Sequence, residues 1–465
     1  MLHRIYGSIH FQNRKNAAKD KPITPLEYAP DYVVLPLSAH PDVLCQSIVA
    51  PGDKVLVGQK IAEPVEAGGI SLHSPVSGTV SCVEPRPGTD GTPALSIVID
   101  NDFQNTPAPV SKLPADPNLL TCTDIASLLN DAGIVDLGAA SFSVGYRLLE
   151  SIGYADTLII DATEGEAYVT AEHRLILERS EQVLSGIRIL MQALSLSTAI
   201  IAVTAGQTDA LNQLRKCVTE DSGIRIVPLK SRYPFGAEKP LIQKLTGRRV
   251  PPGGKPCDVK CAVFNLATTV AISDTIYRGL PLTRRIVTVS GSAVKDAANL
   301  EVPIGTPLEY LLDNCGGLIA KPHRVLLGGP MTGTAQKDLS GYVTPNTNIL
   351  LFASPWEPSF TPCKESPCIR CGRCVKACPM KLLPANLYRY AQQERYDALE
   401  KCHISDCIEC GNCTYVCPAH IPLTEHIREA KRAVYMPLPA DLAELTTPSE
   451  TELIHSGKED CDEQP

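Results

Sequence analysis

Two segments near the C-terminus carry the same pattern of cysteines. The first run is Cys368, Cys371, Cys374 and Cys378, and the second is Cys407, Cys410, Cys413 and Cys417, each followed directly by proline. Both read C-x2-C-x2-C-x3-C-P, the spacing that ligates a [4Fe–4S] cluster, because one short loop can wrap three corners of the cubane. The chain is therefore predicted to hold two clusters and to carry electrons one at a time.

In such doubled runs the fourth cysteine ligates the cluster of the other run. We expect one cluster on Cys368, Cys371, Cys374 and Cys417, and the other on Cys407, Cys410, Cys413 and Cys378. A pair of zinc knuckles or a disulfide framework is the alternative use of these thiols. The doubled spacing, with a proline after each fourth cysteine, favours clusters.

Basic side chains flank the first run, at Lys364, Arg370, Arg373 and Lys376. Cations beside a cluster tune its reduction potential and attract acidic electron carriers such as ferredoxins. A solvated basic face is the simpler interpretation of the same residues.

Composition limits the remaining possibilities. The chain has 465 residues, enough for about three or four domains, and its 44% hydrophobic and 20% charged content is typical of soluble globular proteins. No segment has the roughly 18 consecutive apolar residues of a membrane span, and the N-terminus has no signal-peptide pattern. Any membrane role is therefore expected to be peripheral, through protein contacts. The scattered remaining cysteines and the clusters favour the reducing cytosol.

The net charge of −8 is concentrated at the C-terminal end. Residues 441–465 hold eight acids and one lysine, so they are predicted to form a disordered acidic tail. The rest of the chain is nearly neutral, which argues against a nucleic-acid partner.

The first part of the chain reads as all-β. Residues 31–100 alternate short apolar runs with glycine and proline turns. Segments 51–62 and 74–80 resemble the lipoyl/biotinyl barrel-sandwich pattern, but residues 63–73 contain no lysine to carry such a group. A structural docking role is the better interpretation.

The middle of the chain changes to an α/β pattern. Strands predicted at 157–160 and 198–203 alternate with helical stretches, one of which is expected at 173–194. Further strands at 261–265 and 286–290 and a helix at 307–312 are typical of a small α+β module.

This order of segments resembles the RnfC family, one of the subunits of the Rnf ion-translocating electron-transport complex, over most of the chain. The most specific stretches are the two cysteine runs, residues 233–256 and residues 281–291. The resemblance implies a multidomain α+β fold, divided as follows: a β barrel-sandwich domain (1–118), an α/β FMN/NADH-binding-like domain (119–257), an SLBB-like β-grasp module (258–343), a linker (344–362), a ferredoxin-like dicluster domain (363–436) and the acidic tail (437–465).

The expected flavin loop departs from that family. The family reads A-G-I-V-G-x-G-G-A-x-F-P-T, whereas residues 132–144 read A-G-I-V-D-L-G-A-A-S-F-S-V. Gly138 and Phe142 remain, but Asp136 and Ala139 replace glycines that let backbone N–H groups approach a phosphate. We expect FMN binding to be weakened, most of all by Asp136 if its side chain points inward. Replacing Asp136 and Ala139 together with glycine should then tighten it.

The family's acidic motif, N-G-A-E-C-E-P-Y, corresponds to residues 161–168 and keeps Glu164 and Glu166. The resemblance implies that these two carboxylates lie beside the nicotinamide and ribose of NADH, and two solvated loop acids are the alternative. It also assigns Gly236, Glu238 and Lys239 to the cofactor site. The segment L-L-G-G-P-M-T-G at 326–333 lacks the spacing of a dinucleotide fingerprint and is interpreted as a turn.

The resemblance implies a peripheral subunit on the cytoplasmic side of a membrane complex, with the other Rnf subunits as partners. NADH would deliver a hydride to FMN, and electrons would leave through the clusters. A relay or assembly subunit without FMN is one alternative. A soluble flavin reductase, such as a cobalamin reductase, is another, although in that family the flavin domain usually comes first.

Overall fold

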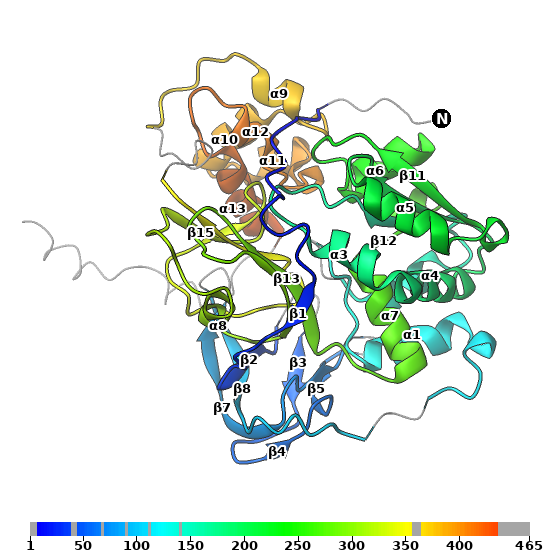
Figure 1. Cartoon of the computed structure of the whole chain (residues 1–465). Helices are drawn as coiled ribbons and strands as arrows, with labels where there is room; N and C mark the ends of the chain where they lie inside the picture. The colour runs from blue at the N-terminus through cyan, green and yellow to red at the C-terminus, as the bar shows by residue number, and fades with distance from the viewer. Residues whose placement is uncertain are drawn as a thin grey trace, which may run out of the picture.

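The computed structural model describes residues 7–38, 44–66, 69–88, 92–109, 113–138, 142–355 and 364–435. Figure 1 shows the β domain at one end of the molecule, the α/β domain along one side, and the cysteine-bearing domain at the opposite end. The acidic tail and Ala139 lie outside the described residues. Within the described residues, no helix is both long and apolar enough to cross a lipid bilayer.

The N-terminal domain is all-β, as expected. One sheet has the order β2-β8-β7-β4 and the other β3-β5-β6. The strands are β2 (Tyr32–Pro36), β3 (Cys45–Ser47), β4 (Lys54–Val55), β5 (Lys60–Pro64), β6 (Leu72–His73), β7 (Gly78–Pro87) and β8 (Pro93–Asn101). Val33, Ile61, Ile97 and Ile99 are fully buried between the sheets, so the alternating pattern of the sequence closes a core.

A four-stranded parallel sheet forms the centre of the α/β domain, in the order β11-β10-β9-β12. Its strands are β9 (Thr157–Ala162), β10 (Ala199–Thr204), β11 (Ile224–Leu229) and β12 (Cys261–Asn265). Its helices are α1 (Cys122–Asp131), α2 (Val144–Ser151), α3 (Ala171–Glu178), α4 (Ser180–Ala193), α5 (Thr208–Cys217), α6 (Glu238–Thr246) and α7 (Leu266–Arg278), with short 3-10 turns at Pro117–Leu119, Glu220–Ser222 and Pro256–Val259.

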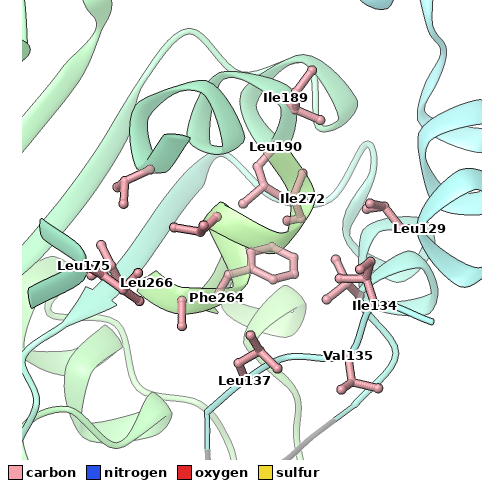
Figure 2. Close-up of a cluster of buried hydrophobic side chains, with 14 of the residues drawn as sticks. Leu129, Ile134, Val135, Leu137, Leu175, Ile189, Leu190, Phe264, Leu266 and Ile272 are labelled. Carbon is pink, nitrogen blue, oxygen red and sulfur yellow. The ribbon is translucent and has the colours of Figure 1, made fainter. Parts of the chain in front are cut away.

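The apolar strands β9, β10 and β12 are buried because helices cover both faces of the sheet. Side chains of α1, α4 and α7 pack on one face around Phe264, and α6 packs on the other. Figure 2 shows the core around Phe264, with Ile134 and Leu137 entering it from the loop after α1. This core fixes the loop on which the flavin residues were predicted.

Two sequence predictions about this domain need correction. The helix expected at 173–194 is divided into α3 and α4, because Arg179 adopts a non-helical conformation (φ −129°, ψ 34°) and its guanidinium bonds Glu301 at 2.8 Å. The sequence pattern places strand β12 in the β-grasp module, but the strand pairs in parallel with β9. The α/β sheet therefore continues beyond the predicted boundary at residue 257.

The β-grasp module contains a six-stranded sheet in the order β1-β14-β13-β17-β15-β16. Its elements are β1 (Ile23–Pro25), β13 (Arg284–Ser290), β14 (Ala298–Pro303), α8 (Leu308–Asp313), β15 (Arg324–Leu327), β16 (Thr334–Gln336) and β17 (Ile349–Ala353). The prediction of a linker at 344–362 is wrong over β17, whose five residues are all buried between β13 and β15. An apolar run that short gives little signal between polar and proline-rich flanks.

The C-terminal domain is helical. Its elements are α9 (Arg373–Ala377), α10 (Pro384–Gln392), α11 (Tyr396–Lys401), a 3-10 turn (Ile404–Asp406), α12 (Asn412–Tyr415) and α13 (Leu423–Tyr435). Leu387, Leu399, Ile404 and Ile427 form its core. Pro384 occupies the first turn of α10, where the missing N–H costs nothing.

The N-terminal segment connects three of these units. Starting at the cluster domain, it runs down the molecule to the β-grasp sheet, where β1 pairs with β14 (Figure 1). The Asn412 side chain donates to the Gly7 carbonyl at 3.0 Å, and the Ile9 N–H donates to the Tyr233 carbonyl at 2.9 Å. We call residues 7–25 the N-terminal strap.

Candidate functional site

The predicted flavin and nicotinamide residues gather at one edge of the α/β sheet. Strands β10 and β11 extend the sheet on one side of β9, and β12 lies on its other side. The strand order therefore reverses between β9 and β12, where Asp161 and Asn265 are paired in register. Open parallel sheets bind their ligands outside the carboxyl ends of the strands at this switch point.

Asp136 points into the switch point and is 5% exposed. One of its oxygens accepts the Gly138 N–H at 2.9 Å, and the other accepts the Asn265 N–H at 2.9 Å and the Thr268 hydroxyl at 3.1 Å. Burial raises the pKa of Asp136, while these donors act in the opposite direction. The inward orientation is the one that we expected to be damaging for flavin.

Gly138 is where the loop passes closest to this carboxylate. A side chain there would lie 2.7 Å from the Asp136 Oδ1 and 3.4 Å from the Asn265 Cβ, so only glycine fits without a shift. The loop on either side is anchored because Val135 and Leu137 are buried (Figure 2). Among the described loop residues, Gly138 therefore keeps the glycine of the family's pattern beside the changed residue Asp136.

Phe142 and Glu238 belong to one short chain of contacts. The Arg147 guanidinium lies 3.8 Å from the centroid of the Phe142 ring. The same guanidinium donates to Glu238 at 2.8 Å. Arg147 therefore brings the two predicted residues together: its guanidinium covers the Phe142 ring and neutralises the charge of Glu238.

Glu164 is held by structural partners. The Lys15 ammonium of the strap lies 2.8 Å from one of its oxygens, and the other oxygen accepts the Glu172 N–H at 2.9 Å and the His173 N–H at 3.3 Å. The carboxylate therefore caps the first turn of α3 and anchors the strap. Its side chain is 2% exposed, which rules out the solvated-loop interpretation.

Glu166 faces the loop that the sequence suggested to be a turn. One oxygen of Glu166 accepts the Thr332 hydroxyl at 2.7 Å, and the other accepts the Met331 N–H at 3.2 Å. Burial raises its pKa to about 7, against the effect of these donors. The segment is indeed a turn, yet it also joins the acidic motif to the cluster domain, because Gly411 packs directly on the Met331 carbonyl.

Two further acids at this edge were missed by sequence reasoning. Asp161 lies at the end of β9 beside Gly236 and accepts the Thr163 N–H and hydroxyl, and burial raises its pKa to about 6. Glu172 accepts the Asn265 side-chain amide, and burial raises its pKa to about 8. Asp161 stands at the first position of the acidic motif, where the family has asparagine, and Glu172 lies outside that motif. Only the fold places these two acids near Asp136.

A buried cation near these acids is Arg285 of β13, which donates to the Leu137 carbonyl at 2.8 Å and to the Thr347 carbonyl at 3.2 Å. Burial lowers its pKa to about 10, an effect that Glu172 and Asp136 oppose. Lys239, predicted to bind the cofactor, instead forms a 2.9 Å ion pair with Asp406 of the cluster domain. The edge is thus rich in buried acid.

The eight predicted cluster ligands are all free thiols. Cys378 lines one cavity together with Cys407, Cys410 and Cys413. Cys374, Cys413 and Cys417 each pack against the apolar cluster of Ala419, Ile421 and Leu423. The fourth cysteine of the first run therefore lies with the second run, as a crossed pair of clusters requires.

The two cysteine runs differ in their surroundings. Cys368 and Cys371 are exposed, whereas the second run lies closer to the α/β domain. Asp406, directly before Cys407, accepts the Lys239 ammonium at 2.9 Å and the Gly253 N–H at 3.0 Å. The loop of the second run is consequently fastened to the domain that carries the acidic motif.

Four family models match the chain in order. They are the RnfC barrel sandwich hybrid domain (residues 3–104), the Nuo51 FMN-binding domain (129–274), the SLBB domain (286–335) and the 4Fe-4S dicluster domain (367–421). This order confirms the fold class expected from the sequence.

Curated relatives match nearly the whole chain. The C subunit of the Na(+)-translocating ferredoxin:NAD(+) oxidoreductase complex of Acetobacterium woodii is 36% identical over 92% of this chain and 96% of its own length. The corresponding subunit of the proton-translocating complex of Clostridium ljungdahlii is 35% identical over 85% of this chain and 86% of its own. The chain belongs to the RnfC family.

RnfC-family members differ in length. The C subunit of the ion-translocating oxidoreductase complex of Pseudomonas aeruginosa is 37% identical over 93% of this chain, but the chain spans only 56% of that relative. A solved NAD+-reducing [NiFe]-hydrogenase overlaps 75% of this chain and 70% of its own, at 17% identity and a TM-score of 0.48. The RnfC-type domain order confirms the expectation of an oxidoreductase subunit with flavin-type and dicluster domains.

The two implied cofactors fit this RnfC-family chain unequally. The crossed arrangement of cysteines suits two [4Fe–4S] clusters. The α/β domain has the architecture of an FMN-binding domain, but at its switch point the donors that suit a phosphate already serve the Asp136 carboxylate. These donors at the switch point are therefore already used by a carboxylate of the chain itself.

Stability is expected to fall as pH rises, because the folded state raises the pKa of Glu166 to about 7 from an ordinary value of 4.5. The folded state binds the proton more tightly, so this contribution is complete below pH 4.5 and is lost as pH passes through 7. Between pH 6 and 8 the loss is about 1.4 kcal/mol, the equivalent of one pKa unit. Thermal melts of Glu166→Gln should show a smaller drop in Tm over this range than the parent chain.

The exposed acid Glu400 provides the control for this measurement. Glu400→Gln should keep the parent's dependence of Tm on pH. An equal pH dependence in Glu166→Gln and the parent chain would show that Glu166 is ionised throughout this range.

Proposed function

We propose that this chain is the peripheral subunit, on the cytoplasmic side of the membrane, through which an ion-translocating complex exchanges electrons with NADH. The α/β domain is the point of entry, and the two [4Fe–4S] clusters lead toward the other subunits. Relatives named as ferredoxin:NAD(+) oxidoreductase subunits support this reaction class. Ion movement is assigned to partner subunits.

The observation that carries the proposal is the attachment of the second cysteine run to the carboxyl edge of the sheet. Lys239 and Gly253 of the α/β domain both donate to Asp406, next to Cys407. Met331 contacts Gly411 from the same run and donates to Glu166. The second cysteine run is thus held against the edge that carries the flavin-type residues, and a short separation favours single-electron transfer between two redox groups.

The chain's own residues have separate tasks in this scheme. The eight cysteines hold the clusters, which carry one electron at a time. Flavin, when bound, accepts a hydride and releases single electrons. Glu166, with a pKa near neutrality, is a group that can hold or release a proton beside the nicotinamide position. The loop at Met331 and Thr332 holds the half-buried Glu166 carboxylate in place through two hydrogen bonds.

The basic face around the first run is the proposed exit. Cys368 and Cys371 are exposed, and they are flanked in the sequence by the exposed side chains Lys364, Arg370, Arg373 and Lys376. Opposite charge steers acidic proteins to such a face. An acidic subunit or a ferredoxin-type carrier is the partner that this surface suits.

The proposed function predicts that NADH reduces the clusters of the isolated chain. The protein, anaerobically reconstituted with iron, sulfide and FMN, should lose visible cluster absorbance and gain reduced-cluster EPR signals when NADH is added. The protein without added FMN serves as the matched control and should respond far more slowly. Dithionite defines complete reduction.

Clusters that dithionite reduces but NADH leaves oxidised, with FMN bound, would contradict the proposal. That result would favour the relay subunit, which receives electrons from another protein. A soluble cobalamin-type reductase is disfavoured by the leading barrel-sandwich domain, which the matched family model assigns to RnfC.

A further inference from the structure

The N-terminus of α7, where the Asn265 side chain accepts the Ala267 N–H, presents further hydrogen-bond donors to the switch point. α7 has 13 residues and begins directly after β12 at the switch point. The first N–H groups of a helix lack partners inside the helix and carry its positive end, so they favour phosphates and carboxylates. Here the Asn265 N–H and the Thr268 hydroxyl converge with the Gly138 N–H on one point.

The group at that point is the Asp136 carboxylate. It accepts all three donors at 2.9–3.1 Å. Thr268 is itself oriented, because its hydroxyl oxygen accepts the Leu137 N–H at 2.8 Å and leaves its proton for Asp136. The carboxylate is thus bound in the manner of an external anion.

Three basic side chains at this edge of the sheet are already paired with acids of the protein, which leaves little positive charge to bind a second anion. Arg147 is paired with Glu238, Lys239 with Asp406 and Lys15 with Glu164. Arg285 donates to carbonyl oxygens within reach of the charge on Asp136. A phosphate entering beside Asp136 would meet a buried like charge.

We propose that Asp136 is an internal substitute for the flavin phosphate, so that FMN binds this chain only by displacing the Asp136 side chain from the N-terminus of α7. This inference rests on the flavin site of the proposed function. Asp136 would set the affinity of that site for FMN. A flavin without a phosphate does not compete with Asp136 for these donors. Asp136 would therefore weaken the binding of FMN but not that of riboflavin.

The test compares FMN with riboflavin on the full-length, cluster-reconstituted chain. Flavin fluorescence quenching gives the dissociation constants for the parent chain, Asp136→Gly and Asp136→Asn. Asp136→Gly should tighten FMN by about tenfold or more, since it frees three donors for the phosphate. Riboflavin should change by less than about threefold. Asp136→Asn removes the charge but keeps the volume, so its effect on FMN should be smaller and of the same sign.

A second measurement uses inorganic phosphate and needs no flavin. Asp136→Gly leaves buried donors without an acceptor, so its Tm should fall below that of the parent chain. Phosphate at millimolar concentration should restore part of that loss, whereas chloride at equal ionic strength should not. The parent chain, whose site is filled, should show no such gain. Asp338→Gly, which removes an exposed loop acid elsewhere, controls for net charge.

The proposal is overturned if FMN binds the parent chain and both Asp136 variants equally, or if riboflavin tightens as much as FMN. It is also overturned if phosphate stabilises the parent chain as much as Asp136→Gly. If Asp136→Gly does not fold, Asp136→Asn decides the question by the ratio of its FMN and riboflavin affinities. These outcomes are independent of NADH: tighter FMN without cluster reduction would contradict the proposed function alone.

Discussion

Replacing Cys378 with serine is expected to remove the cluster of the second cysteine run. Cys378 belongs to the first run by sequence but lines a cavity with Cys407, Cys410 and Cys413. Serine oxygen is a poor substitute for a thiolate at iron. Iron analysis should fall from about eight toward about four atoms per chain, since each cluster holds four. EPR should retain the signal of the cluster on Cys368, Cys371, Cys374 and Cys417.

Cys402 provides the matched control for this variant. It is a partly buried thiol that packs in the same helical core as Cys378, but it lies outside both runs. Cys402→Ser should keep the full iron content. Loss of the other cluster in Cys378→Ser, with the second-run cluster intact, would show that the ligands do not cross. In that case each run of four cysteines would ligate its own cluster.

Replacing Lys15 with methionine is expected to cause a large loss of stability. Lys15 is 8% exposed, and its ammonium lies 2.8 Å from both the carbonyl and a carboxylate oxygen of Glu164. Removing one partner of a buried pair leaves an uncompensated charge, which costs about 3–5 kcal/mol. Urea unfolding followed by circular dichroism should show a correspondingly lower midpoint.

The strap supplies its own control for this experiment. Lys19 is on the same segment, and its ammonium forms a 4.0 Å ion pair with the exposed Asp20. Lys19→Met should change the unfolding free energy by less than about 0.5 kcal/mol. Glu164→Gln combined with Lys15→Met should recover part of the loss, because the double change removes both charges. A stable Lys15→Met chain would mean that the strap does not depend on this pair.

The sequence alone predicted the features that depend on local spacing. The cysteine runs identify their own chemistry, because the spacing within each loop is what wraps a cubane. The alternation of residues 31–100 and the apolar runs at 157–160 and 198–203 predicted the β and α/β domains, since burial imposes these periods on the chain. Glu166 was identified differently, from the resemblance of residues 161–168 to a motif of the RnfC family.

Tertiary structure decided what those local features touch. Asp136 was expected to be harmful if it pointed inward, but only the pairing of β12 with β9 brings the α7 N-terminus to meet it. The strap, the break at Arg179 and the contact of Met331 with Gly411 all join residues more than 75 positions apart. Contacts at such separations leave no local period in the chain. They follow from the order and packing of the sheets. That order is also what places the buried Asp136 carboxylate at the N-terminus of α7.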